Sequence, residues 1–181
     1  MKNILLIIDV QKGFIINEAV TLTKNNIDGL LSLGCFDCVI STVYQNYENS
    51  PIIKLMGWNK LLKDDEQQLT GKVQHHSDYV VKKTTYSAVN AELLDTLKGI
   101  CDDNLPEYVF VVGVDTECCV LATATDLFEL GIRPIVLTKY CGASSGAEYH
   151  KAGLLSMQSL IGKCNMFNGH ITSSLYLERA Y

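Results

Sequence analysis

Residues 106–131 read PEYVFVVGVDTECCVLATATDLFELG, and this stretch decides the fold. It begins with the β-branched and aromatic run 109–112, which has the length and composition of a buried strand. Gly113 interrupts the run, and residues 115–117 offer polar capping groups before a helical period that Gly131 is placed to end. The apolar residues of that period share one predicted helix face: Val120, Ala124, Leu127 and Phe128. The stretch therefore predicts a buried strand that turns tightly into a helix.

Two cysteines, Cys118 and Cys119, lie in the first turn of this predicted helix. A thiol there is close to free backbone N–H groups and to the positive end of the helix dipole. Both features favour thiolate, so the position predicts a lowered pKa and an activated nucleophile. The competing interpretation is that both cysteines are small core residues, as free cysteine commonly is.

The composition predicts one globular domain that spans residues 1–181. Of its 181 residues 48% are hydrophobic, which is enough for a sizeable core, and only three are proline. We find no low-complexity segment, no internal repeat and no shift in composition that would mark a linker.

The net charge and the number of cysteines limit which partners and which cellular compartment we expect. The net charge is −5 without a dense basic cluster, which argues against nucleic acid and anionic membranes as partners. No apolar run approaches the ~18 residues of a membrane helix, and the start MKNILLIIDV predicts a strand in place of a targeting segment. Seven scattered cysteines, an odd number, fit a reducing cytoplasm better than a disulfide framework.

Strand and helix patterns alternate along the chain. The predicted strands are 3–10, 37–44, 79–82, 109–112, 134–138 and an edge strand within 164–172. The predicted helices are 23–33, a short one at 58–63, 90–98, the cysteine-bearing helix, and 146–161. This order predicts an α/β fold: a three-layer αβα, doubly wound, mostly parallel six-stranded sheet.

Three reactive side chains follow the ends of predicted strands: Asp9, Lys83 and Cys119. Ligands of doubly wound sheets bind outside the carboxyl ends of the strands, where the strand order reverses. Each residue alone has an ordinary explanation, a turn cap, a surface lysine or a core cysteine. Their shared placement at one edge of the sheet favours chemistry.

These residues resemble the isochorismatase-like cysteine hydrolases, the superfamily that includes nicotinamidases and other small amidases. LLIIDVQKGF (5–14) resembles the family's first strand with its catalytic carboxylate, here Asp9. VVKKTTYSA (80–88) resembles its K-x-x-x-S-A element, which selects Lys83. VVGVDTECCVLATA resembles its G-V-x-T-x-x-C-V-x-x-T-A signature, which selects Cys119 and not Cys118. The three elements occur in the family's order.

The resemblance implies a fold and a mechanism. Asp9 would be the general base for Cys119, Lys83 would hold a positive charge beside both, and Cys119 would attack the carbonyl of a small non-peptide amide. The family's non-proline cis peptide would fall at Val114–Asp115 and turn N–H groups toward an oxyanion. It also implies a small-molecule substrate and a homo-oligomer. Two alternatives stay open: a catalytically silent relative that binds a small molecule or protein, and a thiol redox protein that uses Cys118 and Cys119.

The sequence also departs from the nicotinamidase pattern. That branch carries an Asp-x-His metal site after the second strand, whereas STVYQNYENSP (41–51) has no histidine. His75 and His76 are neighbours in a polar stretch and are expected to be solvated. We therefore predict no metal and no cofactor, and we do not expect nicotinamide as the substrate.

Further candidates come from spacing and position. The CxxC spacing of Cys35 and Cys38 lacks a second pair and a helix start, so a structural role is expected. Aromatic and polar residues just past strand ends or in the loop 45–57 are candidates for the substrate pocket, although such aromatics are commonly core residues. They are Phe14, Tyr44, Asn46, Trp58 and Tyr86.

Overall fold

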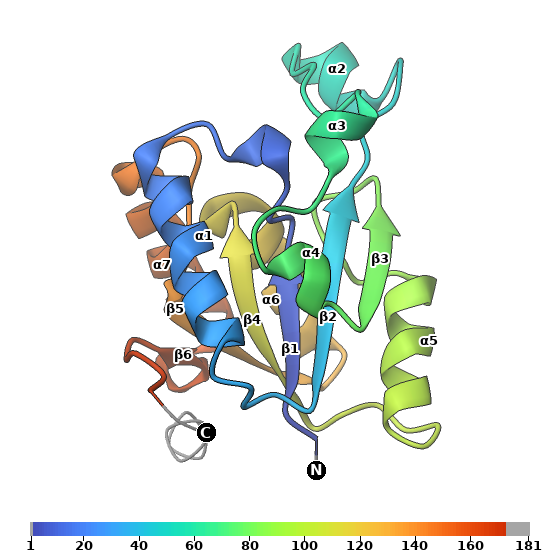
Figure 1. The fold of residues 1–181 in the computed structure, drawn as a ribbon, viewed down its shortest axis with the longest axis vertical. Coiled ribbons are helices and arrows are strands. Elements are labelled where there is room, and N and C mark those ends of the chain that lie inside the picture. Colours follow the sequence, from blue (N-terminus) through green and yellow to red (C-terminus); the bar gives the residue numbers. More distant parts are fainter. Residues whose placement is uncertain (1, 173–181) are drawn as a thin grey trace.

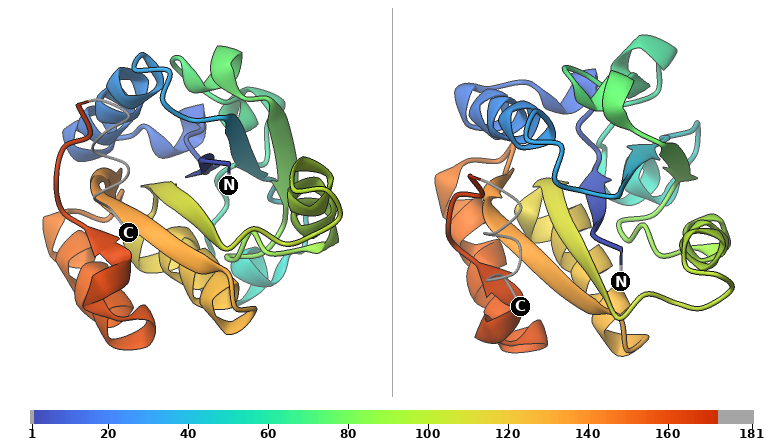
Figure 2. Two further views of the ribbon diagram at one scale, coloured as in Figure 1. Left: turned by 90° about the horizontal axis from the view of Figure 1, so that it is seen from below. Right: turned by 60° about the horizontal axis from the view of Figure 1, so that its bottom comes forward.

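The computed structural model describes residues 2–172 and has three layers, with a six-stranded sheet between helices (Figure 1; Figure 2). The strands are β1 (Ile4–Ile8), β2 (Cys38–Tyr44), β3 (Tyr79–Lys83), β4 (Tyr108–Val114), β5 (Arg133–Gly142) and β6 (Met166–Phe167). All pairings are parallel, in the order β3-β2-β1-β4-β5-β6. The predicted α/β fold and six-strand sheet are confirmed.

Alternating strand residues divide the core into two apolar layers. Leu5 and Ile7 of β1 pack with α1 (Glu18–Leu31) on one face. Leu6 and Ile8 pack on the other face, which is covered by α5 (Ala91–Ile100), α6 (Leu121–Glu129) and α7 (Ala147–Ile161). Because both faces are covered, every residue of β1, β2 and β4 is buried, as their continuous apolar sequences predict.

The strand order reverses between β1 and β4, which is where such sheets bind ligands. Gly113 of β4 pairs with Ile8 of β1 and has a φ of 124°. A Cβ at Gly113 would collide with the Ile8 main chain, so only glycine permits this approach at the switch point.

Several boundaries differ from the sequence prediction. The helix expected at 23–33 begins at Glu18, because the Asn17 side chain caps it by accepting from the Val20 N–H. The helix expected at 58–63 is absent, and a helix lies instead within the predicted loop, at α2 (Pro51–Met56). Ser50 caps α2 and Pro51 starts it, signals for a helix start that the sequence carried.

The remaining polar stretch forms two single-turn helices, α3 (Asp64–Gln67) and α4 (Val73–His76). Short 3₁₀ turns lie at Lys12–Phe14 and Lys163–Asn165. Phe128 was expected on the buried face of α6, but its side chain is 45% exposed. None of the helices in the part described is both long and apolar enough to cross a membrane.

Candidate active site

A buried ion pair lies at the carboxyl edge of the sheet. Asp9 directly follows β1 and Lys83 ends β3, and their side chains reach each other across β2 with Lys83 Nζ 2.7 Å from Asp9 Oδ2. Both side chains are fully buried. Asp9 has a φ of 51°, a left-handed conformation that aspartate tolerates better than most residues. Charges are buried in this way only when they are paired and hydrogen-bonded.

Strand β2, which lies between β1 and β3 in the sheet, contributes to the position of this pair. The Thr42 hydroxyl donates to Asp9 Oδ1 at 2.6 Å and accepts from the Asp9 N–H at 3.1 Å, so it holds both the carboxylate and the main chain of Asp9. Lys83 Nζ donates to the carbonyl oxygens of Thr85 and Tyr86, each at 2.9 Å. It also lies 5.1 Å from the ring centroid of Tyr44. Burial is the largest single influence and lowers the pKa of Lys83, but Asp9 and Cys119 together outweigh it, so the pKa is raised.

Cys119 joins this pair from the other side of the switch point. It lies in a single π-helical turn, η2 (Thr116–Val120), which connects β4 to α6. The Asp115 carbonyl accepts from the N–H groups of both Cys118 and Val120, each at 3.1 Å. Cys119 is 5% exposed, and Asp9 and Lys83 both shift the pKa of its thiol, Asp9 upward and Lys83 downward. The structure thus brings Asp9, Lys83 and Cys119 together.

The expectation of a lowered thiol pKa is wrong for the resting protein. Burial raises the pKa of Cys119 well above its ordinary value, the negative charge of Asp9 adds to the rise, and Lys83 offsets it only in part. The pKa of Cys118 is raised to about 11, first by burial and then by Glu117 and Asp115. The sequence prediction considered the helix dipole beside the thiol but not the loss of hydration on burial, which favours the neutral thiol over the thiolate.

A second carboxylate lies beside the turn. The Val114–Asp115 peptide bond is cis. The Asp115 carboxylate accepts hydrogen bonds from the Ser144 backbone N–H and hydroxyl, each at 2.6 Å. Burial raises the pKa of Asp115 despite these two bonds. Ser144, in the loop between β5 and α7, is itself held by Asn17, whose amide donates to the Ser144 carbonyl at 2.7 Å.

The candidate pocket residues separate into three groups. Phe14, Tyr44 and Trp58 form an aromatic cluster, with the Trp58 ring centroid 6.0 Å from that of Phe14 and 6.1 Å from that of Tyr44. Tyr86 is exposed and, with Tyr44, lines a cavity of about 300 Å³ between α2 and residues 84–86.

Asn46 is buried and holds the loop in place through its side chain, which forms hydrogen bonds with Lys60, Ser50, Trp58 and Tyr47. Substrate contact by Asn46 stays a prediction.

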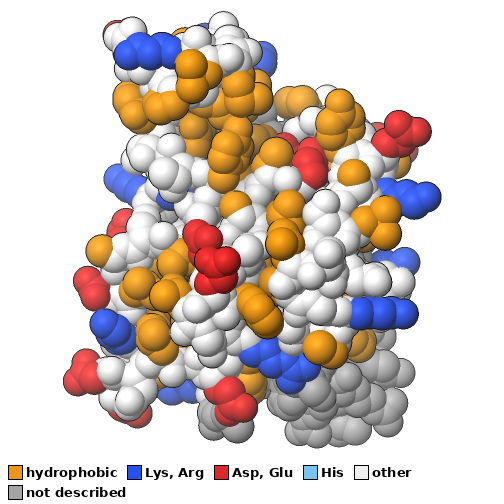
Figure 3. Space-filling model, turned by 180° about the vertical axis from the view of Figure 1, so that it is seen from behind, with side chains coloured by type: hydrophobic (Ala, Val, Ile, Leu, Met, Phe, Trp, Pro, Cys, Tyr) orange, Lys and Arg blue, Asp and Glu red, His pale blue; other side chains and the backbone are white. Residues whose placement is uncertain are grey.

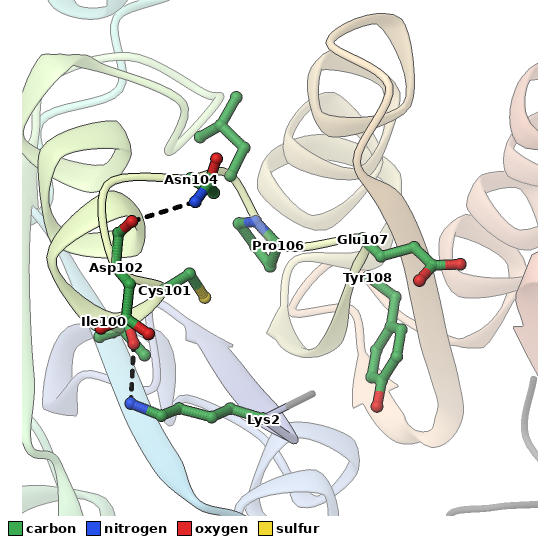
Figure 4. A pocket seen from close by; sticks show the side chains of 9 residues that line it. Lys2, Ile100, Cys101, Asp102, Asn104, Pro106, Glu107 and Tyr108 are labelled. Atoms are coloured by element: carbon green, nitrogen blue, oxygen red, sulfur yellow. Dashed lines mark hydrogen bonds between the residues drawn. The ribbon is translucent and has the colours of Figure 1, made fainter.

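A larger cavity, of about 460 Å³, opens at the opposite edge of the sheet, at the amino ends of the strands (Figure 4). Lys2 Nζ donates there to the Ile100 carbonyl at 2.7 Å, and Asn104 donates to the Asp102 carbonyl at 3.0 Å. Glu107 and Cys101 line the same cavity, whereas the buried Asp9–Lys83 ion pair lies at the other edge of the sheet.

His75 and His76 are both exposed at the end of α4. Within residues 2–172, no group of three His, Cys, Asp or Glu side chains could share a metal ion. The donors present therefore do not fit the metal site of the nicotinamidase branch. Cys35 and Cys38 are free thiols at the start of β2, and burial raises the pKa of Cys38 to about 11.

Sequence reasoning missed two residues of this site. Thr42 had a detectable signal, because it is a polar residue inside a strand that is otherwise predicted to be buried. Ser144 had none, because it reaches Asp115 across 29 positions of sequence.

Comparisons with known proteins agree with the fold. The family model described as "Isochorismatase domain" matches residues 3–172. An isochorismatase-like hydrolase from Alkaliphilus metalliredigens superposes with a TM-score of 0.80 and 18% identity, over 99% of both chains. A nicotinamidase/pyrazinamidase from Bacillus subtilis gives 0.73 and 20% over 90% of this chain and 97% of that one. N-carbamoylsarcosine amidase from Thermoplasma acidophilum gives 0.68 and 20% over 87% and 93%. No curated protein matches the sequence.

Proposed function

The chain belongs to the isochorismatase family of hydrolases, and we propose that it cleaves the C–N bond of small non-peptide amides through Asp9, Lys83 and Cys119. One observation carries the proposal: a fully buried Asp9–Lys83 ion pair acts on a nearly buried thiol beside the point where the strand order reverses. A carboxylate and an ammonium are costly to bury, so their placement against a nucleophile favours a catalytic role.

The raised thiol pKa fits transfer of the proton during the reaction. Asp9 accepts the Cys119 proton as the sulfur attacks the carbonyl carbon, so thiolate need not accumulate beforehand. Lys83 keeps its charge beside both groups and limits their mutual repulsion. The N–H groups of Asp115 and Cys119 are assigned to the developing oxyanion, as the family resemblance implies.

The remaining steps of the cycle, loss of the amine and hydrolysis of the thioester, return every group to its starting state. The Asp9 carboxyl donates its proton to the leaving nitrogen, the C–N bond breaks, and ammonia or an amine departs from the acyl thioester. Asp9 then takes a proton from water, which attacks the thioester carbonyl and releases a carboxylic acid. Cys119 regains its proton from Asp9 as the C–S bond breaks.

An ammonia-release assay over a panel of primary amides tests this function. Wild type and Cys118→Ala should release ammonia, and Cys119→Ala should lose at least ~10³-fold in kcat/KM. Intact-mass spectrometry of quenched reactions should show an acyl adduct that maps to Cys119.

The alternatives give different results in the same assay. A redox role predicts a reversible Cys118–Cys119 disulfide and no turnover. A silent relative predicts amide binding without adducts. Equal ammonia release from wild type and Cys119→Ala would refute the proposal.

A further inference from the structure

We infer that the cavity between α2 and residues 84–86 receives the acyl group of the substrate, and that this group is apolar and uncharged. The inference rests on the proposed function and specifies the class of substrate: small primary amides with an aliphatic or aromatic acyl chain. In such an amide the acyl group is the only part large enough to fill the cavity.

The cavity adjoins the catalytic groups through shared residues. Thr85 and Tyr86 form part of its wall, and their carbonyl oxygens accept the hydrogen bonds of Lys83 Nζ. Tyr44 forms another part, and its ring lies beneath the same ammonium. Burial is the main cause of the raised pKa of both phenols, and the charge of Cys119 adds to the rise in each. A carbonyl at Cys119 would therefore have its acyl chain within reach of the cavity.

The lining is apolar and carries no charged side chain. It consists of Tyr44, Pro51, Ile52, Leu55, Met56, Thr84, Thr85 and Tyr86. The Tyr86 hydroxyl lies 3.5 Å from Met56 Sδ, so the two walls meet. Lys83, the cation beside this cavity, is already paired with Asp9 and bound by two carbonyl oxygens. A charged acyl group would lose part of its hydration here without gaining a charged partner from the lining, which is costly.

Two apolar residues of α2, Leu55 and Met56, are largely exposed in the part of the chain that the structure describes. Leu55 is 84% exposed and Met56 is 68% exposed, although α2 has caps at both ends. Seen from behind, hydrophobic side chains gather at the α2 end of the molecule, at the top left of Figure 3. A cavity of about 300 Å³ is at the small end of the ~300–1,000 Å³ range of ligand sites. It suits an acyl chain of moderate size.

Binding to Cys119→Ala tests the cavity independently of turnover. Calorimetric titrations would use acetamide, butanamide and hexanamide, with succinamate as the anionic counterpart of butanamide. We expect affinity to rise about fourfold per methylene along the neutral series. Butanamide should bind at least tenfold more tightly than succinamate. Equal affinities, or tighter binding of succinamate, would overturn the inference even if wild type proves to be an amidase.

A charge placed in the cavity tests the assignment in the active enzyme. Leu55→Arg should lower the ratio of kcat/KM for butanamide to that for succinamate at least tenfold, mainly through KM. Leu155→Arg is the matched control, because Leu155 is 61% exposed on α7 and does not line this cavity. That control should keep the wild-type ratio.

The competing occupant is a second copy of the chain. Light scattering on both variants separates the two. If Leu55→Arg changes the oligomeric state and leaves the butanamide-to-succinamate ratio as in wild type, the patch is a subunit contact and the inference fails. If the ratio falls with the oligomeric state unchanged, the acyl-pocket assignment stands. Absence of turnover in wild type would refute the proposed function, while the titrations would still decide the pocket.

Discussion

The charged residues at the two edges of the sheet differ in burial and in their partners. At the carboxyl edge, Asp9 and Lys83 form a buried pair beside a thiol. At the amino edge, Lys2 is exposed and bonds a main-chain carbonyl beside the larger cavity, of about 460 Å³. The larger cavity therefore lies at the amino edge, whereas the candidate catalytic residues lie at the carboxyl edge. Burial of mutually dependent charges is the better guide to function, because it is costly without a compensating role.

The largest expected effect separates the two lysines. Lys83→Met would leave the Asp9 carboxylate buried without its cation, which should cost ~3–5 kcal/mol in the free energy of unfolding and abolish activity. Lys2→Met removes one hydrogen bond at an exposed residue and should cost ~1 kcal/mol or less. Urea unfolding of both variants measures the contrast.

A double variant sharpens this comparison. Asp9→Asn combined with Lys83→Met removes both charges and should recover much of the lost stability, while activity stays absent. Equal losses for Lys2→Met and Lys83→Met would show that the buried pair contributes no more than a surface contact.

A second expected effect concerns the pH dependence of the thiol. Burial and the negative charge of Asp9 hold the pKa of Cys119 above its ordinary value, so the free protein carries a neutral thiol at pH 7. In a Cys118→Ala background, alkylation of Cys119 should accelerate continuously above pH 9 and show no plateau between pH 6 and 8. Peptide mapping separates this signal from Cys101 at the opposite edge. A plateau near pH 7 would contradict the raised pKa.

The same shift has a consequence for stability. A raised pKa in the folded state means that the contribution of the thiol is fully present below its unfolded pKa and is lost as pH rises through the folded pKa. The free energy of unfolding should therefore fall more steeply above pH 9 in wild type than in Cys119→Ala. Identical slopes would show that the thiol is not protected from ionisation.

The smallest expected effect compares one hydroxyl at each edge. Ser144→Ala removes one of the two hydrogen bonds that hold the Asp115 carboxylate and should lower kcat about three- to tenfold, with KM nearly unchanged. Tyr108→Phe removes a hydroxyl that donates to Asn3 Oδ1 at the amino edge and should leave kcat unchanged at a cost of ~1 kcal/mol in stability. Steady-state kinetics and thermal melts measure both. Equal kcat losses would remove the distinction between the edges.

The sequence was a good guide wherever a pattern was local and repeated. Continuous apolar runs predicted the buried strands, and the polar turn after residues 109–112 placed Cys119 beside Asp9 and Lys83. It was a poor guide between β2 and β3, where short polar segments form α2, α3 and α4 without long periodic stretches. Helices of four to six residues are too short for hydrophobic periodicity to identify, so only their caps could reveal them.

By itself the sequence determined the family, the order of the strands along the chain, and which three side chains end at one edge of the sheet. Those properties follow from local hydrophobic patterns and short motifs. The tertiary structure decided that the Cys119 thiol is neutral and that an apolar cavity lies beside α2. It also decided the hydrogen bonds from Thr42 to Asp9 and from Ser144 to Asp115. Each of these depends on which distant residues exclude water from a group or donate to it, and such contacts exist only after the strands have paired.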